Sequence, residues 1–292
     1  MTSKALLGFN AAAAVGAVVL YLSGARVVLD RSSGEAERPV DIHVQTSQAN
    51  PSLISSDGKV NNYTCTHSGM KPKFLSYDPI MVYIENFITP YETEHLKKLA
   101  LAEYEPSVVQ NFNNQAGAKK VFVDSSSRKS ETAWLQDGDP VVDCVKSRAA
   151  TFQGFAPNAS MEQLAVLKYT AGGEFETHYD FHYATPRPVD RITSFFATLE
   201  ASDDIEGGST WFPFVLRPAW RDKEPWCEWL DCSYKRGLAA RPIPGNAVFW
   251  VNFRKDGTGH RETAHGGQPV LKGSKIGLNI WTRGKVISVN GS

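Results

Sequence analysis

A histidine and an aspartate stand two positions apart in the largely apolar stretch from Thr177 to Tyr183. The stretch is typical of a β-strand, in which side chains two apart point to the same face, about 7 Å from each other. His178 and Asp180 would therefore point to one spot above a sheet. Two imidazoles and one carboxylate form the facial triad that holds iron(II) and leaves coordination positions open. The sequence predicts such a centre, with a third ligand from elsewhere in the chain.

His265 is the candidate third ligand, because it lies in a Thr-Ala-His-Gly-Gly segment and is followed ten positions later by Lys275. By itself a His-x-Asp triplet is more often a surface pair or a local hydrogen bond, and a single histidine is often a core residue. The ordered set of four residues is much harder to explain in that way. His182 and His260 also lie near these segments, but the triad is complete without them.

Length and composition restrict the class of protein. The chain has 292 residues, of which 42% are hydrophobic and 11% aromatic, enough for one large or two small domains with a buried core. Its formal net charge is zero and it has no long basic run, which excludes binding to a phosphate backbone. Gly172 and Gly173 follow a predicted strand but open no helix, which excludes a nucleotide-binding loop.

The first residues indicate targeting. Residues 5–22 are almost entirely apolar, with Lys4 before them and Arg26 and Arg31 after them. This is about the minimum length of a membrane span. We expect residues 1–29 to be either a retained signal anchor or a signal peptide cut after residues 23–25. The first alternative places the domain in the lumen at the endoplasmic reticulum membrane, and the second leads to secretion.

Other features agree with a secretory compartment. The chain contains three sequons for N-glycosylation, at Asn62, Asn158 and Asn290. Cys227 and Cys232 are near enough in sequence to form a disulfide. Cys144, in contrast, lies in a helical pattern and is expected to be a small buried apolar residue. The segment 213–235 also carries three tryptophans, which either cover a substrate or pack on the domain.

The elements that must position the candidate site follow a linker. Residues 30–76 are rich in Ser, Pro, Asn, Gln and Gly, and we expect a flexible linker there. The folded domain should span residues 77–286, followed by a short tail at 287–292. Thr89 before Pro90 and Glu92 predicts a capped helix start, and Asp139 before Pro140 predicts a second. These helices are expected to support a sheet.

Beyond residue 160 the pattern changes to short strands. Apolar or alternating runs are separated by Gly, Pro and Asp clusters, at residues 164–169, 176–183, 192–199, 209–212, 245–251, 264–270 and 275–281. Seven short strands without helices between them favour an antiparallel barrel of two sheets, such as a jelly roll. The predicted fold class is therefore α+β, with a double-stranded β-helix as its core and helices before it.

Several of these segments carry a resemblance that covers residues 81–281, about two thirds of the chain. They are Arg-Lys-Ser at 128–130, Leu-Lys-Tyr-Thr-Ala-Gly-Gly-Glu-Phe-Glu-Thr-His-Tyr-Asp at 167–180, Gly-Gly-Ser-Thr at 207–210, Gly-Leu at 237–238, Pro-Gly-Asn-Ala-Val-Phe-Trp at 244–250, His-Gly-Gly-Gln-Pro-Val at 265–270 and Lys-Gly-Ser-Lys at 272–275. In these segments the chain resembles the catalytic domain of the prolyl 4-hydroxylases, which are iron(II)- and 2-oxoglutarate-dependent dioxygenases.

The resemblance implies roles for residues at matching positions. His178, Asp180 and His265 would be both the catalytic residues and the iron ligands, with 2-oxoglutarate and O2 as cosubstrates and ascorbate as a further cofactor. Lys275 would pair with the far carboxylate of 2-oxoglutarate. The other positions implied are Tyr169 and Thr210, whose hydroxyls assist that carboxylate, Trp281, which packs near it, and Arg128, Ser130 and Arg191, which belong to the peptide groove or are ordinary surface residues.

The implied reaction is hydroxylation of peptidyl-proline at C4, with release of succinate and CO2. Two departures favour an alternative, a small-molecule tailoring oxygenase with the same site. Phe175 stands where the family usually has a tyrosine, and Ile276 where an aromatic residue is common. A non-catalytic jelly-roll binding module is a third hypothesis. The sequence does not identify the molecule that is hydroxylated, a partner subunit or the oligomeric state.

Overall fold

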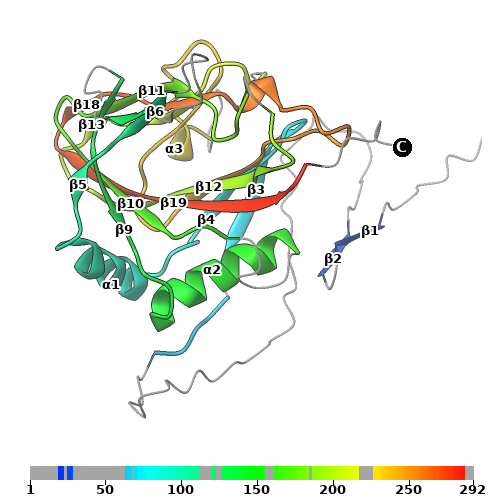
Figure 1. Ribbon diagram of the computed structural model, residues 1–292, viewed down its shortest axis with the longest axis horizontal. Helices are drawn as coiled ribbons and strands as arrows, with labels where there is room; N and C mark the ends of the chain where they lie inside the picture. The colour runs from blue at the N-terminus through cyan, green and yellow to red at the C-terminus, as the bar shows by residue number, and fades with distance from the viewer. Residues whose placement is uncertain are drawn as a thin grey trace, which may run out of the picture.

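The computed structural model describes residues 19–22, 25–28, 63–67, 69–111, 120–122, 127–154, 161–183, 186–216 and 226–286. Its centre is a large sheet that faces a smaller one (Figure 1). In spatial order the large sheet consists of β3 (Lys71–Tyr77), β4 (Ile80–Glu85), β16 (Ala247–Val251), β12 (Val189–Ala201), β19 (Ser274–Lys285), β10 (Ala165–Thr170), β9 (Glu131–Trp134) and β5 (Glu105–Pro106).

The small sheet completes the barrel. Its order is β15 (Leu238–Ala240), β14 (Thr210–Phe212), β17 (His265–Gly267), β11 (Glu174–His178) and β8 (Arg128–Lys129). Neighbouring strands in both sheets pair antiparallel. Three separate pairs are β13 (Glu206–Gly207) with β18 (Val270–Lys272), β6 (Val109–Asn111) with β7 (Lys120–Phe122), and β1 (Val19–Leu22) with β2 (Ala25–Val28). This arrangement, mostly strand with few helices, is consistent with the predicted jelly roll.

Two helices cover the outer face of the large sheet (Figure 1). Helix α1 (Pro90–Ala100) begins with a capping box in which Thr89 and Glu92 bind each other's backbone N–H groups. Helix α2 (Pro140–Gln153) begins at Asp139, whose side chain accepts two backbone N–H groups. Leu96 from α1 joins Phe195 from the large sheet in one buried apolar cluster, to which α2 also contributes. The two helix starts predicted from the sequence are confirmed.

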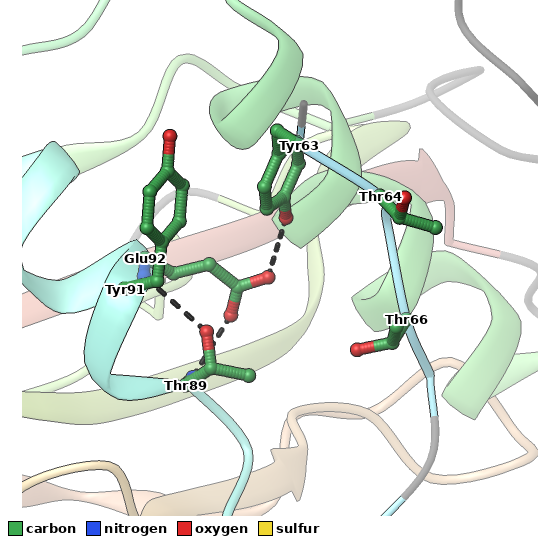
Figure 2. Close-up of a pocket in the computed structure, with 6 residues that line it drawn as sticks. All are labelled: Tyr63, Thr64, Thr66, Thr89, Tyr91 and Glu92. Carbon is green, nitrogen blue, oxygen red and sulfur yellow. Dashed lines mark hydrogen bonds between the residues drawn. The ribbon is translucent and has the colours of Figure 1, made fainter. Parts of the chain in front are cut away.

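The segment 63–67 is fastened to this helix layer. Cys65 forms a disulfide with Cys144 of α2, across 79 residues of sequence. The ring of Tyr63 stacks on that of Tyr91 at 5.3 Å, and its hydroxyl donates to Glu92 over 2.6 Å (Figure 2). These residues line a cavity of about 300 Å³ at the start of α1. We call residues 63–67, with this disulfide, the N-terminal clasp.

The clasp corrects two expectations. Cys144 is a disulfide partner, where a free buried apolar residue was expected. The predicted linker ends too late at residue 76, because Cys65 is already fixed to the domain and β3 (Lys71–Tyr77) is the edge strand of the large sheet. A buried ion pair lies beneath the clasp. Arg148 donates to both carboxylate oxygens of Glu92, at 2.8 and 2.6 Å, and to the carbonyl of Thr66.

The disulfide predicted from the sequence, Cys227–Cys232, is confirmed. The short helix α3 (Trp226–Trp229) begins beside it, and both of its tryptophans are buried in an apolar cluster with the barrel. Of the two alternatives for this segment, these two tryptophans therefore follow the second, since they pack on the domain. The third tryptophan of the segment, Trp220, lies outside the described residues.

Most of the targeting segment also lies outside the described residues, and only β1 and β2 are seen from it. The same holds for the three sequon asparagines and for the tail at 287–292. Within the part of the chain that the structure describes, no helix is long and apolar enough to cross a membrane.

Candidate metal centre and its surroundings

The three predicted ligands come together between strands of the small sheet. His178 ends β11 and is the direct partner of His265, which begins β17, so that their rings lie 4.5 Å apart. Asp180 was expected on the same strand, but it lies two residues beyond the end of β11. Its Oδ1 lies 3.9 Å from Nε2 of His178 and its Oδ2 lies 3.8 Å from Nε2 of His265. One atom from each residue can thus contact a single ion.

The backbone fixes which nitrogen each imidazole offers. Nδ1 of His178 lies 2.8 Å from the carbonyl oxygen of Glu176, and Nδ1 of His265 lies 2.9 Å from that of Thr263. Because a carbonyl only accepts, each Nδ1 carries the proton and each Nε2 presents its lone pair toward Asp180. Both rings are therefore held in the tautomer that a metal ligand needs.

Aromatic side chains hold the same rings from the other side. Phe175 stacks on His178 with ring centroids 3.8 Å apart. Phe212 and Trp250 lie 5.3 and 4.7 Å from the ring of His265. This packing keeps water away from one side of the centre and restricts rotation of both imidazoles.

The electrostatics of the three residues fit a divalent cation. Burial, together with the neighbouring His265, lowers the pKa of His178 to about 3, so its imidazole is neutral. Burial alone would raise the pKa of Asp180, but the two imidazoles and Arg191 keep that pKa below its usual value. Its Oδ2 is nevertheless buried without a hydrogen-bond partner. A buried carboxylate that faces two imidazole nitrogens is the donor set that iron(II) takes in facial triads.

Lys275 is buried to 1% exposure on β19, directly opposite Tyr169 of β10. Its Nζ donates to the carbonyl of Gly208 over 2.5 Å, and burial lowers its pKa to about 7. No carboxylate of the described residues pairs with it. An ammonium without a counter-ion in this position suits an anionic ligand. Thr210, two residues after Gly208, is also buried there.

Trp281 lies elsewhere than expected. It is six residues along β19 from Lys275, which separates the two backbones by about 20 Å. Its ring lies beside Trp134 at 6.1 Å and beneath the guanidinium of Arg191 at 3.6 Å. The expectation that it packs against the amine end of the site is therefore wrong, since it belongs to the opposite end of the strand.

The predicted substrate residues are not ordinary surface charges. The guanidinium of Arg128 lies 4.5 Å above the ring of Phe175, and its Nε donates to Ser130 over 3.1 Å. Arg191 makes two hydrogen bonds to Glu162, of 2.9 and 2.8 Å. Both guanidiniums are within electrostatic reach of Asp180.

Sequence reasoning missed two contributors. Glu162 belongs to no recognisable motif, and its contribution is seen only from its hydrogen bonds with Arg191 in the structure. Phe212 could have been found from strand alternation, because it is two residues after Thr210 and shares its face. A second cluster of ligand-type side chains, Cys65, His67 and Cys144, holds no metal because both sulfurs are in the disulfide.

Comparisons with known proteins agree with this geometry. A family model described as the 2OG-Fe(II) oxygenase superfamily matches residues 164–283. Prolyl 4-hydroxylase 5 of Arabidopsis thaliana is 33% identical over 213 residues, which cover 71% of this chain and 69% of the relative. Prolyl 4-hydroxylase 2 of the same plant is 30% identical over 242 residues, covering 80% and 75%. The solved structure of a viral collagen prolyl hydroxylase from Paramecium bursaria Chlorella virus-1, in complex with 2OG, is 21% identical with a TM-score of 0.48, covering 70% of this chain and 95% of that one.

Proposed function

The chain belongs to the prolyl 4-hydroxylase family of the 2OG-Fe(II) oxygenases, and from this we propose that it hydroxylates peptidyl-proline at C4, with release of succinate and CO2. It is a 2-oxoglutarate-dependent dioxygenase that uses iron(II), 2-oxoglutarate and O2. The observation that carries the proposal is the convergence of His178, Asp180 and His265, with an unpartnered carboxylate oxygen facing the imidazole nitrogens.

Each residue has a task in this proposal. His178, Asp180 and His265 would hold the iron. When bound, iron and 2-oxoglutarate supply the oxidative chemistry, so the protein needs no acid–base pair of its own. Lys275 would bind the far carboxylate of 2-oxoglutarate through its ammonium. Burial raises the pKa of Tyr169, so its hydroxyl stays protonated and can donate a hydrogen bond in the same region.

The peptide would enter at the other end of the barrel. Arg191 stacks on Trp281 and is oriented by Glu162, and Arg128 lies over Phe175 beside the metal centre. We propose that these arginines, with Ser130, contact the backbone carbonyls of the substrate on both sides of the target proline. Arginine suits this task because its planar fork donates several hydrogen bonds in fixed directions.

One of the two residues that favoured a small-molecule oxygenase no longer supports that alternative. Ile276 packs against the apolar cluster under the helices, so its side chain points away from Lys275 and does not line the site. Phe175 does line it, and it remains the observation that favours the alternative. The third hypothesis, a non-catalytic binding module, predicts that the protein does not bind metal.

One experiment separates these functions. The full chain, loaded with iron(II), is incubated with 2-oxoglutarate, ascorbate and a panel of proline-containing peptides and small molecules. The products are analysed by tandem mass spectrometry. We expect one added oxygen atom on a proline residue and none when that proline is replaced by alanine. Coupling of succinate release only to a free small molecule would reject the peptide substrate.

We also propose a location in the lumen of the endoplasmic reticulum, with secretion as the alternative. The apolar residues 5–22 and the three sequons support it. Expression of the chain with a C-terminal tag tests it. A membrane-bound product whose mobility shifts after endoglycosidase treatment is expected, whereas an unglycosylated product in the cytosol would contradict it.

A further inference from the structure

Two arginines flank one phenylalanine at the rim of the barrel. The guanidinium carbons of Arg236 and Arg261 lie 5.1 and 5.2 Å from the ring centroid of Phe214. Both arginines are exposed, and Phe214 is half-buried. Nε of Arg236 donates to the carbonyl of Pro213 over 3.1 Å. The ring thus has two cationic groups beside it, and the hydrogen bond orients one of them. We call these three residues the arginine pair.

The strand register places the arginine pair beyond the metal centre. Thr210 is opposite Gly267 and Trp211 is opposite Gly266, so the next residue, Phe212, is level with the ligand His265. The carbonyl that holds Lys275 belongs to Gly208, which lies before these residues. Phe214 follows Phe212 by two residues, in the turn after β14, and so lies past the level of the metal. The arginine pair is therefore on the side opposite the lysine, where the peptide would enter.

The rim around the arginine pair is connected to the ligands. The hydroxyl of Tyr179, the residue between His178 and Asp180, donates to the carbonyl of Arg261 over 3.4 Å. Tyr179 also stacks on the exposed Tyr183 with ring centroids 4.6 Å apart. A peptide that reaches the metal from this side must pass these rings and the two guanidiniums.

Neither guanidinium has an anionic partner among the described residues. The nearest acid in sequence, Glu262, is already bound by Arg254 at 2.9 Å. Because both guanidiniums lie beside the ring of Phe214, an acidic side chain that reaches this ring can pair with one or the other of them. A partner of opposite charge would thus complete an arrangement that the fold leaves open.

We propose that the arginine pair binds an acidic side chain of the peptide substrate, Asp or Glu, close to the proline that is hydroxylated. This inference rests on the proposed function. A proline-rich peptide rises about 3.1 Å per residue in the polyproline II form, so a side chain two or three residues from the target proline lies about 6 to 9 Å along the peptide, far enough to reach the turn past the metal.

Equilibrium binding tests the inference without turnover. The full chain is loaded with Mn²⁺ in place of iron and with 2-oxoglutarate, under argon. Fluorescent proline-rich peptides with Asp two or three residues before or after the central proline are compared with the same peptides carrying Asn. We expect one Asp peptide to bind about tenfold tighter than its Asn counterpart, with a difference that shrinks as salt is added.

Variants assign the preference to the arginine pair. R236Q/R261Q should bind Asp and Asn peptides equally, with unchanged affinity for the Asn peptide. R236K/R261K, which keeps both charges, should retain most of the preference. K98Q, which removes an exposed charge from α1 on the helix layer, is the matched control and should bind like wild type. Circular dichroism confirms that each variant is folded.

The outcomes separate this inference from the proposed function. Equal binding of Asp and Asn peptides by the wild type, or a preference that survives in R236Q/R261Q, overturns the arginine pair as an acid-binding site. If the preference exists and depends on the pair, the inference holds even when no proline gains oxygen, and that second result would reject only the proposed reaction.

Discussion

His178 and His265 are direct partners across two antiparallel strands, and their rings lie 4.5 Å apart. One backbone pairing therefore sets the distance between two of the three candidate ligands, before any metal binds. The third, Asp180, depends on the turn after β11, and it brings a buried oxygen without a partner. The fold thus keeps an ionised carboxylate in place beside two imidazoles, where an ion would stabilise it further.

The variant Asp180→Asn separates metal binding from folding. The amide has the same shape but no charge, so we expect loss of turnover and a large loss of affinity for Co²⁺, measured by anaerobic titration calorimetry. Without metal, the variant should stay folded but be somewhat less stable in urea at neutral pH than wild type, because the fold keeps the pKa of Asp180 below its usual value and the amide loses that favourable charge. Asp203→Asn, at an exposed site, is the control and should bind Co²⁺ normally. Undiminished Co²⁺ affinity in Asp180→Asn would show that Asp180 is not a ligand.

Lys275 predicts a pH dependence of cosubstrate binding. The pKa of its buried amine is about 7 in the free protein, and the bound carboxylate requires the charged form. The affinity for 2-oxoglutarate should therefore fall as pH rises above about 7, with proton uptake on binding near pH 8. Calorimetry in buffers of different ionisation enthalpy measures that uptake. Binding without proton uptake would contradict the role of this amine.

The same residue affects stability with a definite sign. In the unfolded chain the amine stays protonated up to about 10.5, whereas in the folded protein it loses its proton near 7. The unfolded state binds more protons between these values, so this group makes the free energy of unfolding rise with pH. Lys275→Met should remove that rise and abolish 2-oxoglutarate binding. A pH–stability curve identical to that of wild type would show that the amine is not buried as described.

Arg191 should affect the peptide more than the cosubstrate. Arg191→Gln removes both hydrogen bonds to Glu162 and uncovers the ring of Trp281. We expect the KM for a peptide substrate to rise about tenfold, or about 1.4 kcal/mol, with little change in the KM for 2-oxoglutarate. Arg283→Gln is the matched control, because Arg283 is more exposed and approaches the same carboxylate at only 3.9 Å. Equal effects of the two variants would argue against a specific role of Arg191.

The N-terminal clasp should contribute to stability and not to catalysis. The Cys65–Cys144 bond spans 79 residues, so it restricts the unfolded chain strongly. The double variant Cys65→Ser/Cys144→Ser should lower the free energy of unfolding by about 3 kcal/mol in urea. Its KM values should stay unchanged, because the clasp is on the helix layer. Cys227→Ser/Cys232→Ser, which opens a far shorter loop, should cost less stability. The reverse order would contradict this entropic account.

Residue types and spacing were enough to predict the candidate ligands and the lysine, because few side chains can bind a metal or a dicarboxylate. Strand alternation gave the approximate positions of the barrel strands along the chain, but not their order in the sheets. It failed at Asp180, since periodicity does not show that β11 ends at His178. It also failed at β3, where Pro72 weakens the strand pattern and is tolerated because the strand is at the sheet edge. The pairs Cys65–Cys144 and Arg191–Glu162 join distant segments and leave no local signal.

The clasp has a practical consequence for handling the protein. Tyr63 is fixed on the helix layer, and the metal centre lies among strands of the small sheet on the opposite side of the large one (Figures 1 and 2). A carrier protein, an affinity tag or a solid support joined directly to residue 63 would therefore lie on the helix layer, away from the barrel entrance. Immobilised at residue 63, the enzyme should keep its access to long peptides, whereas coupling through the arginine pair should block it.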